Sequence, residues 1–533
     1  MKKLKNILIA GAVIVALPSC KKYLDINENP NDPTSSTPEL VLPQAITRTA
    51  NTVPTFNFYG AQTVGYLANG GGVSGWGSII SYNYTTADFA GLWNTTYDIL
   101  EDFQYVINNT EGKETYAYHN AAAKIMKAYN FELLVDTYND VPYTEAFNGT
   151  KNLLPKYDKA QDIYKDLAVQ LDAAIAQIKA AQAQTDDSKK PTALASGSDP
   201  LFKGDVNKWK QFANTLKLRL VVRGSGKVSF ANTTFDAAGF LTDDAIVNPG
   251  YTKIDGKQNP LWDYFAYTAA SAAVTRGGQY VPTPFILSFY DGNKVLDTVR
   301  GKLTYKEWSG TNGTSTPTNQ LGSQATNAAK GATPNSWILA ANATSSARGI
   351  FKAADAGQPI MLAAESYFLQ AEADVRTITS NNAKANFNKG LEASFRYLMK
   401  DAAGNVLAAA AAADSAVVAT TKYVTANSSN YLVNFDAATT NQEKIEAIIT
   451  QKYIALNMIL SHEAWNEYRR TGYPKIVAGS ANSRLTFAST VSQSTNTEKL
   501  PTRLLYPESE FRYNQNNVPK GINAFTSKIF WAL

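Results

Sequence analysis

Few side chains in this sequence could perform acid–base or nucleophilic chemistry. Its 533 residues include two histidines, His119 and His462, and one cysteine, Cys20. His462 is followed by Glu463 but not by a second histidine at helical spacing, so the zinc-protease pattern is absent. No Gly-x-Ser-x-Gly turn follows a strand pattern, and no phosphate-binding glycine-lysine loop occurs. We therefore predict that the protein is not an enzyme, binds no cofactor and no metal, and uses both histidines structurally.

Acidic residues alone do not change this prediction. A glycosidase needs only two carboxyl groups about 5–10 Å apart, and a chain with 45 acids always contains such a pair. No motif singles one out.

The first twenty residues have the composition of a lipoprotein export signal. Three lysines (Lys2, Lys3 and Lys5) precede an apolar run over residues 7–17. That run of about 11 residues is too short to cross a hydrocarbon core of about 30 Å, but it suits a signal peptide. It ends in Leu-Pro-Ser-Cys, which resembles a lipoprotein signal peptidase site and predicts lipid on Cys20. The alternative is an ordinary cleaved signal with a chance cysteine.

Lipid would attach the protein to a membrane without a spanning segment. Two or more acyl chains hold a protein stably, at about 0.8 kcal/mol for each buried methylene. No later stretch offers 18 uninterrupted apolar residues, so we expect a soluble body. Three of the 50 basic residues lie in the leader, so 47 remain against 45 acids, a balance that argues against nucleic-acid binding. We predict a signal peptide at 1–19, a lipidated tether at 20–40 and a single domain at 41–533.

Helical periodicity dominates the sequence from Thr86 onward. Within 114–138, for example, Ala122, Ile125 and Tyr129 recur at three and four residues and give one apolar face. The predicted helices, mostly in neighbouring pairs, are 87–109 with 114–138, 159–183 with 204–223, 359–376 with 383–400, and 442–470. Such pairs stack as tetratricopeptide repeats do, although the period is not a regular one of about 34 residues. An irregular helical bundle is the alternative.

Two regions interrupt this helical pattern. Residues 224–358 are rich in Gly, Ser, Thr and Asn, and residues 404–440 are similar. We predict long loops and short strands there, packed on the helical scaffold, where binding surfaces usually lie. The predicted fold class is therefore mainly α, with degenerate tetratricopeptide-like helix pairs and a loop-rich insert at about 224–358.

Two groups of residues are predicted to hold the scaffold together. Trp209, Phe212 and Leu216 have helical spacing and should lie in the core. Glu467, Arg469 and Arg470 should form an ion-pair network that locks the last helices, although contact with a partner is an alternative.

Four motifs occur in order over nearly the whole chain. They are Tyr-Leu-Asp-Ile-Asn-Glu-Asn-Pro-Asn at 23–31 with Pro-Glu-Leu-Val-Leu-Pro-Gln-Ala at 38–45, Asp-Thr-Tyr-Asn-Asp-Val-Pro-Tyr at 136–143, Gly-Asp-Val-Asn-Lys-Trp at 204–209, and Trp-Asn-Glu-Tyr-Arg-Arg-Thr-Gly-Tyr-Pro at 465–474. Together they resemble the SusD/RagB family of nutrient-binding outer-membrane lipoproteins, particularly its SusD-like branch. The Asp-Pro-Arg turn frequent in that family is replaced here by Asp-Thr-Val-Arg at 297–300.

This resemblance implies a receptor rather than an enzyme. It implies a place in the outer membrane facing the cell surface, and a SusC-like TonB-dependent transporter as partner, to which the protein delivers oligosaccharides as a hinged lid. Oligopeptides are the alternative ligand, because the wider family includes peptide binders. The third hypothesis is a structural or assembly lipoprotein that binds no ligand.

The resemblance also implies that a glycan would stack on aromatic side chains in loops. Sugars present apolar C–H faces to aromatic rings, while polar side chains bind their hydroxyl groups. Trp76 is flanked by glycines and lacks periodic apolar neighbours, so we expect it to be exposed. The candidate ligand-binding residues are Trp76, Tyr82, Tyr84, Arg276, Tyr280, Trp308 and Trp337.

Overall fold

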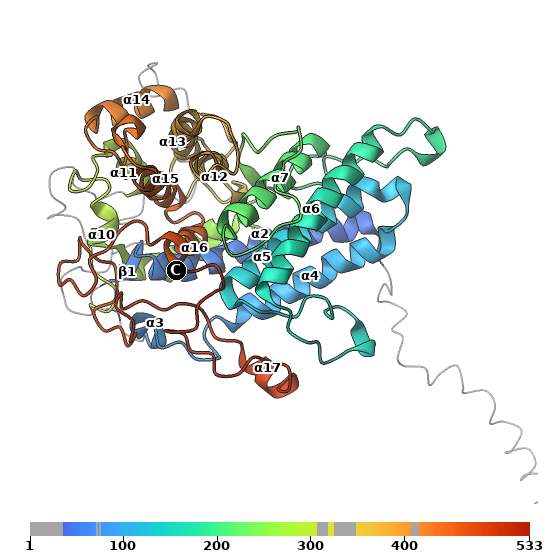
Figure 1. The fold of residues 1–533 in the computed structure, drawn as a ribbon, viewed down its shortest axis with the longest axis horizontal. Helices are drawn as coiled ribbons and strands as arrows, with labels where there is room; N and C mark the ends of the chain where they lie inside the picture. Colours follow the sequence, from blue (N-terminus) through green and yellow to red (C-terminus); the bar gives the residue numbers. More distant parts are fainter. Residues whose placement is uncertain (1–35, 71–72, 74–75, 306–317, 324–347, 407–414) are drawn as a thin grey trace, which may run out of the picture.

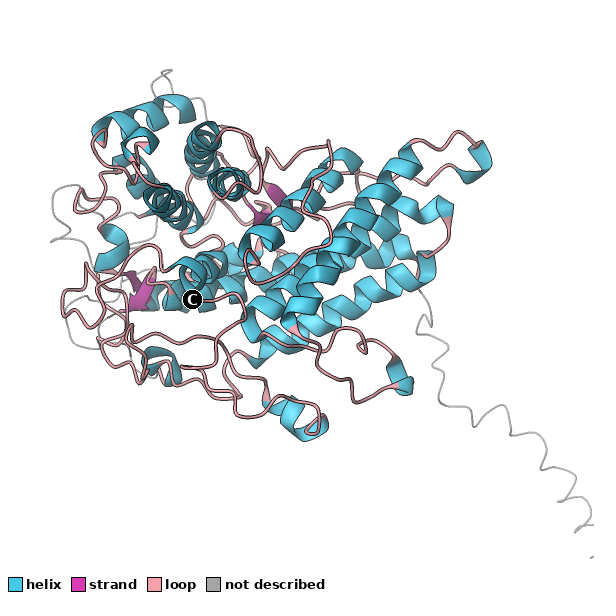
Figure 2. Ribbon diagram, in the orientation of Figure 1, coloured by secondary structure: helices cyan, strands magenta, loops and turns pink. Residues whose placement is uncertain are grey.

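The computed structural model describes residues 36–70, 73, 76–305, 318–323, 348–406 and 415–533. Over these residues the protein is mainly helical, with four strands of three or four residues each (Figure 2). The predicted mainly α fold class is therefore confirmed. No helix in this part of the chain has the length and apolar character needed to cross a membrane.

Long antiparallel helices form the first half of the scaffold. They are α2 (Pro38–Thr63), α4 (Ala90–Thr110), α5 (Ala117–Tyr138), α6 (Ala160–Gln182) and α7 (Val206–Arg223). In sequence order each packs against the next, so that α4 to α7 lie side by side (Figure 1). Because α5 contacts α2, α4, α6 and α7, nearly all of its side chains are buried, including the acidic Glu132 and Asp136.

A second group of helices continues the stack. It consists of α12 (Ala363–Val375), α13 (Ala383–Met399), α14 (Ala416–Ala426), α15 (Asn441–Leu456) and α16 (Ser461–Thr471). Helix α12 contacts α7 of the first group as well as α13 and α15. Helix α16 returns to pack against α2, and this contact brings two helices that are far apart in sequence together near the centre of the molecule (Figure 1).

Short elements and loops pack on this scaffold. The short helices are α3 (Ser78–Ser81), α8 (Pro260–Phe265), α9 (Thr275–Gln279), α10 (Pro284–Leu287), α11 (Thr298–Thr304) and α17 (Glu508–Tyr513). Strand β1 (Leu67–Asn69) pairs antiparallel with β3 (Tyr280–Pro282), and β2 (Ala245–Val247) pairs with β4 (Gln358–Met361). The first pairing places the loop after α2 beside the loop-rich region.

Most predicted helices agree with the structure, but three predictions need correction. The tether was predicted to reach residue 40 and helices to start at Thr86, yet α2 begins at Pro38. Pro43 and Pro54 lie inside α2, and each removes an intrahelical hydrogen bond, so the local pattern did not indicate a helix. Packing against α4 and α16 stabilises helix α2.

The other two corrections concern the second half of the chain. The predicted loop 404–440 contains a helix, α14, whose N-terminus Ser415 caps. The predicted helix 442–470 is two helices, α15 and α16.

The crossing of α2 and α16 depends on a glycine. A Cβ atom on Gly60 would lie 2.2 Å from the His462 nitrogen and 2.4 Å from the Ser461 carbonyl carbon. We expect Gly60→Ala to lower the free energy of unfolding by about 1–3 kcal/mol, because backbone atoms of α16 must move. Guanidinium unfolding followed by circular dichroism measures this loss.

Gly91→Ala is the matched control for Gly60→Ala. Gly91 lies in α4, and no neighbouring atom lies within 4 Å of an added Cβ. Alanine there should leave the stability unchanged or raise it by about 0.5–1 kcal/mol. Equal losses for the two variants would contradict the close approach at Gly60.

Candidate ligand-binding face

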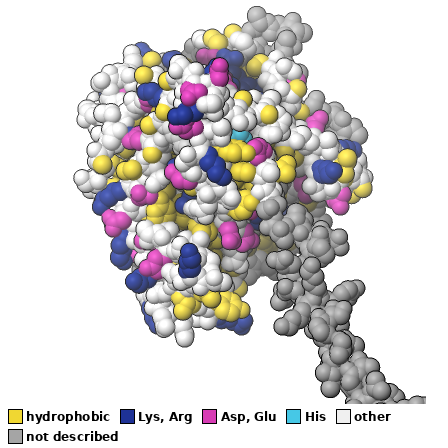
Figure 3. All heavy atoms as spheres, turned by 90° about the vertical axis from the view of Figure 1, so that its right-hand side faces the viewer, with side chains coloured by type: hydrophobic (Ala, Val, Ile, Leu, Met, Phe, Trp, Pro, Cys, Tyr) yellow, Lys and Arg dark blue, Asp and Glu magenta, His cyan; other side chains and the backbone are white. Residues whose placement is uncertain are grey.

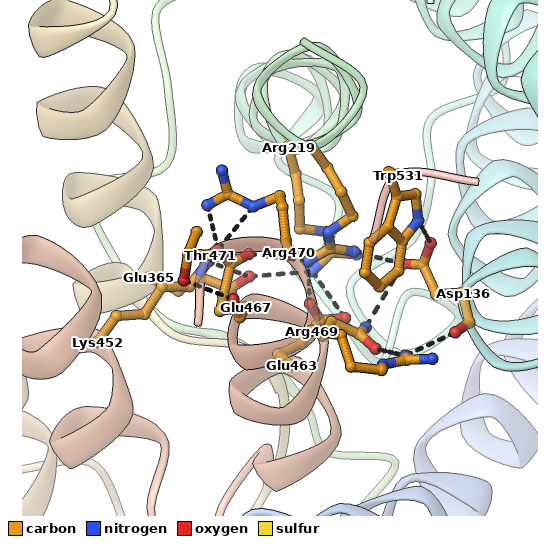
Figure 4. Close-up of polar contacts among 12 residues, drawn as sticks. Asp136, Arg219, Glu365, Lys452, Glu463, Glu467, Arg469, Arg470, Thr471 and Trp531 are labelled. Atoms are coloured by element: carbon orange, nitrogen blue, oxygen red, sulfur yellow. Dashed lines mark hydrogen bonds and ion pairs between the residues drawn. The ribbon is translucent and has the colours of Figure 1, made fainter. Parts of the chain in front are cut away.

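A cluster of buried charges fixes the scaffold that carries the loops. Three pairs of charged residues have i,i+4 spacing, so each pair lies on one helix face: Glu132 and Asp136 on α5, Arg219 and Arg223 on α7, and Glu463 and Glu467 on α16. The three faces converge, with Lys452 and Glu365 beside them (Figure 4). All of these side chains are at most 2% exposed.

Each arginine of α7 binds several carboxylates. Arg219 donates to Glu132 at 2.6 Å and to Glu365 at 3.2 Å. Arg223 donates to Glu463 at 2.5 Å and to Glu467 at 3.1 Å, and it also contacts Asp136. Planar guanidinium groups can satisfy several carboxylates at fixed angles, which the point charge of lysine cannot do.

The predicted ion-pair network of the last helices is confirmed for two of its three residues. Arg470 pairs with Glu467 and, at 2.7 Å, with Glu372 of α12. Arg469 differs, because it donates to the backbone oxygen of Asp136 at 2.7 Å and lies 4.9 Å from the centre of the Trp531 ring. The network therefore also joins α5, α7, α12 and α15 to α16. The predicted core residues Trp209, Phe212 and Leu216 are confirmed, at no more than 1% exposed.

Both histidines are buried, as a structural role requires. His119 is 2% exposed and His462 is 4% exposed. Burial lowers the pKa of His462 to about 4, and neither of its ring nitrogens has a hydrogen-bond partner among the described residues. In the same part of the chain, no three His, Cys, Asp or Glu side chains lie together as metal ligands would.

The structure brings several predicted ligand-binding residues together. Pairing of Asn69 with Tyr280 places the loop of Trp76 beside α9, which carries Arg276. The rings of Trp76 and Tyr280 meet edge to face with centres 4.9 Å apart. Tyr82 and Tyr84 belong to an adjoining cluster with Tyr59.

The predicted exposure of Trp76 is wrong. Its side chain is 7% exposed, and its indole N–H donates to the Val73 oxygen at 3.0 Å. Tyr82 is fully buried, and Tyr84 and Tyr280 are only 4% and 5% exposed. These rings offer no open face to a ligand in this conformation. The flanking glycines gave no sign of this burial, because Tyr280, which covers Trp76, comes about 200 residues later in the chain.

Among the predicted ligand-binding residues that the structure describes, Arg276 is the one that remains partly exposed. Its guanidinium carbon lies 3.8 Å from the centre of the Tyr264 ring, and its Nη1 donates to the Tyr264 backbone oxygen at 3.2 Å. Tyr264 is also partly exposed and was not predicted; its aromatic-rich surroundings at 262–267 were the available signal. The pair thus presents an aromatic ring and a guanidinium together.

Three predicted residues lie outside the described residues. They are the lipidation site Cys20 and the ligand candidates Trp308 and Trp337. On the side of the molecule shown in Figure 3, acidic and basic side chains are interspersed without a large area of one sign.

Comparisons with known proteins agree with this fold. The family described as "Starch-binding associating with outer membrane" matches residues 30–274, and that described as "Susd and RagB outer membrane lipoprotein" matches residues 322–530. The chain belongs to the SusD/RagB family of outer-membrane lipoproteins, whose members are binding proteins. A search of curated protein sequences finds no match.

Solved structures share the fold at low sequence identity. A SusD/RagB family protein from Bacteroides thetaiotaomicron superposes with a TM-score of 0.67 at 17% identity, covering 93% of this chain and 99% of its own. A chitin-binding SusD homologue from Flavobacterium johnsoniae gives 0.63 at 21% identity, covering 92% and 98%. A further chitin-binding protein gives 0.66 at 23% identity, covering 93% and 99%. At these identities the likeness shows the fold alone.

Proposed function

We propose that this protein is a cell-surface lipoprotein, anchored through Cys20, that captures oligosaccharides and delivers them to a SusC-like TonB-dependent transporter without catalysing a reaction. The observation that carries the ligand class is the partly exposed stack of Arg276 on Tyr264. An aromatic face next to hydrogen-bond donors suits a sugar ring, which has apolar C–H faces and polar edges. The family matches and the two chitin-binding structures support the same class.

The Tyr264 ring should contribute directly to glycan affinity. We expect the purified protein to bind chito-oligosaccharides in isothermal titration calorimetry, and Tyr264→Ala to weaken that binding about tenfold, a loss of about 1.4 kcal/mol. Tyr513→Ala is the matched control, because Tyr513 lies on α17, 75% exposed, and should leave the affinity unchanged.

The same titration separates the alternatives. Binding of oligopeptides but not of any glycan in a panel would make the ligand class wrong and leave the receptor role intact. Lack of thermal stabilisation by either class would indicate an assembly lipoprotein. Release of shorter sugars during incubation would contradict the absence of catalysis. Co-purification from membranes with a TonB-dependent transporter tests the partner.

A further inference from the structure

A cavity of about 340 Å³ lies within the first helical group, between α4, α5, α6 and the loop at 143–148. This volume falls at the lower end of the range for ligand pockets, about 300–1,000 Å³. The side chains that matter here are Gln104, Asn108, Lys127, Tyr143, Phe147 and Asp166. None of them belongs to the Arg276 and Tyr264 surface.

Lys127 is an incompletely paired cation in the wall of this cavity. Its Nζ donates to the Gln104 Oε1 at 2.6 Å and lies 5.7–5.9 Å from the ring centres of Phe131, Tyr143 and Phe147. Within the described residues, no carboxylate oxygen lies within 4.0 Å of that nitrogen and no other acceptor binds it. Burial lowers the pKa of Lys127 to about 8, so the ammonium form still predominates at neutral pH.

Among the described residues no carboxylate pairs directly with Lys127, although the charge of Asp166 favours its ammonium form. Lys124, one turn earlier on α5, is paired with Glu111 at 3.0 Å. Asp166 accepts a hydrogen bond from the Tyr143 hydroxyl instead of binding the ammonium group. An ammonium group has three N–H donors, so an anion that enters the cavity finds donors that the protein does not use.

The cavity is held in shape by hydrogen bonds around it. Asp158 accepts from the backbone nitrogens of Tyr143 and Thr144, both at 2.9 Å, and fixes the loop over the cavity. The Gln104 Nε2 donates to the Asn108 Oδ1 at 2.7 Å, which orients the Gln104 oxygen toward Lys127. A pocket fixed in this way needs little rearrangement to accept a ligand.

We propose that this cavity is a second binding site, for a small sugar acid that carries a carboxylate and several hydroxyl groups. Lys127 pairs with the carboxylate, the carboxamides of Gln104 and Asn108 bind hydroxyl groups, and the Phe147 ring covers a C–H face. A charge-assisted pair with a partly buried ammonium group is stronger than the same pair at the surface. This site does not depend on glycan capture at Arg276.

Sodium D-glucuronate and D-glucose are suitable probes, because they differ only in the carboxylate at C6. In titrations of the full purified protein at pH 7, glucuronate should bind at least tenfold more tightly than glucose. Lys127→Met should weaken glucuronate binding at least tenfold and leave weak glucose binding unchanged. Lys127→Gln provides a second neutral variant of similar length. Lys165→Met is the control, because Lys165 lies on α6 outside the cavity lining with a side chain 45% exposed.

The pH dependence separates charge pairing from a structural role. Glucuronate affinity should fall by up to about tenfold per pH unit above pH 8, where Lys127 of the free protein loses its proton, and glucose affinity should stay level. Equal affinity for the two sugars, binding of neither, or full glucuronate affinity in Lys127→Met and Lys127→Gln would overturn the proposal. None of these results bears on chito-oligosaccharide binding, because Tyr264 is intact in every variant.

Discussion

Replacement of Arg223 by methionine is expected to lower the free energy of unfolding by about 3–5 kcal/mol, the cost of removing one partner from a buried ion pair. Arg223 is 1% exposed and contacts Glu132, Asp136, Glu463 and Glu467. Methionine fills similar space but removes the ion-pair partner that the described residues give Asp136, and takes one cation away from Glu132, Glu463 and Glu467. The uncompensated charge, rather than lost packing, dominates the cost.

Arg396→Met is the matched control for this prediction. Arg396 pairs with Glu392 one helical turn away, but its side chain is 45% exposed, so water screens both charges. The same substitution there should cost about 0–1 kcal/mol. Guanidinium unfolding followed by circular dichroism measures both variants. A loss for Arg223→Met no larger than that for Arg396→Met would show that the buried carboxylates do not need this guanidinium group.

The buried charges around Arg223 nearly balance one another. Four cations, Arg219, Arg223, Lys452 and Arg470, form ion pairs with six carboxyl groups, those of Glu132, Asp136, Glu365, Glu372, Glu463 and Glu467. Arg469 adds a fifth positive charge nearby, and Arg376 adds a sixth by pairing with Glu372 at 2.7 Å. Six cations therefore face the six carboxyl groups, and burial raises the pKa of Glu132 to about 7. The cluster therefore approaches neutrality, as a buried group of charges requires.

The sequence predicted the helical scaffold better than the candidate ligand-binding face, for a physical reason. The limits of α4 to α7 follow from 3.6-residue periodicity, which is a local property of the chain. The i,i+4 spacing of Glu132 with Asp136 and of Arg219 with Arg223 is also visible in the sequence. Only the fold shows that the two pairs face each other. The burial of Trp76 depends on Tyr280, far along the chain, and no local pattern encodes that contact.

His462 should make the protein sensitive to acid. Its pKa falls from an ordinary 6.5 to about 4 because burial disfavours the imidazolium form. Above pH 6.5 the ring is neutral in both the folded and the unfolded states, so it contributes no pH dependence. Between pH 6.5 and 4 the unfolded state binds a proton that the folded state does not, and the free energy of unfolding falls as the pH falls.

We therefore expect His462 to cost about 2 kcal/mol of stability at pH 5 and about 3 kcal/mol below pH 4. His462→Phe should remove this loss, because it keeps a ring against Phe56, 5.7 Å away, and neither imidazole nitrogen has a partner to lose among the described residues. Its advantage over the wild type, absent at pH 8, should grow as the pH falls to 5 in guanidinium unfolding. His119→Phe, at the other histidine of the chain, is the matched comparison. It should gain less stability at low pH, because burial lowers the pKa of His119 less than that of His462. An unchanged difference between wild type and His462→Phe from pH 8 to pH 5 would mean that His462 binds a proton as readily in the folded state as in the unfolded state, and would contradict the prediction.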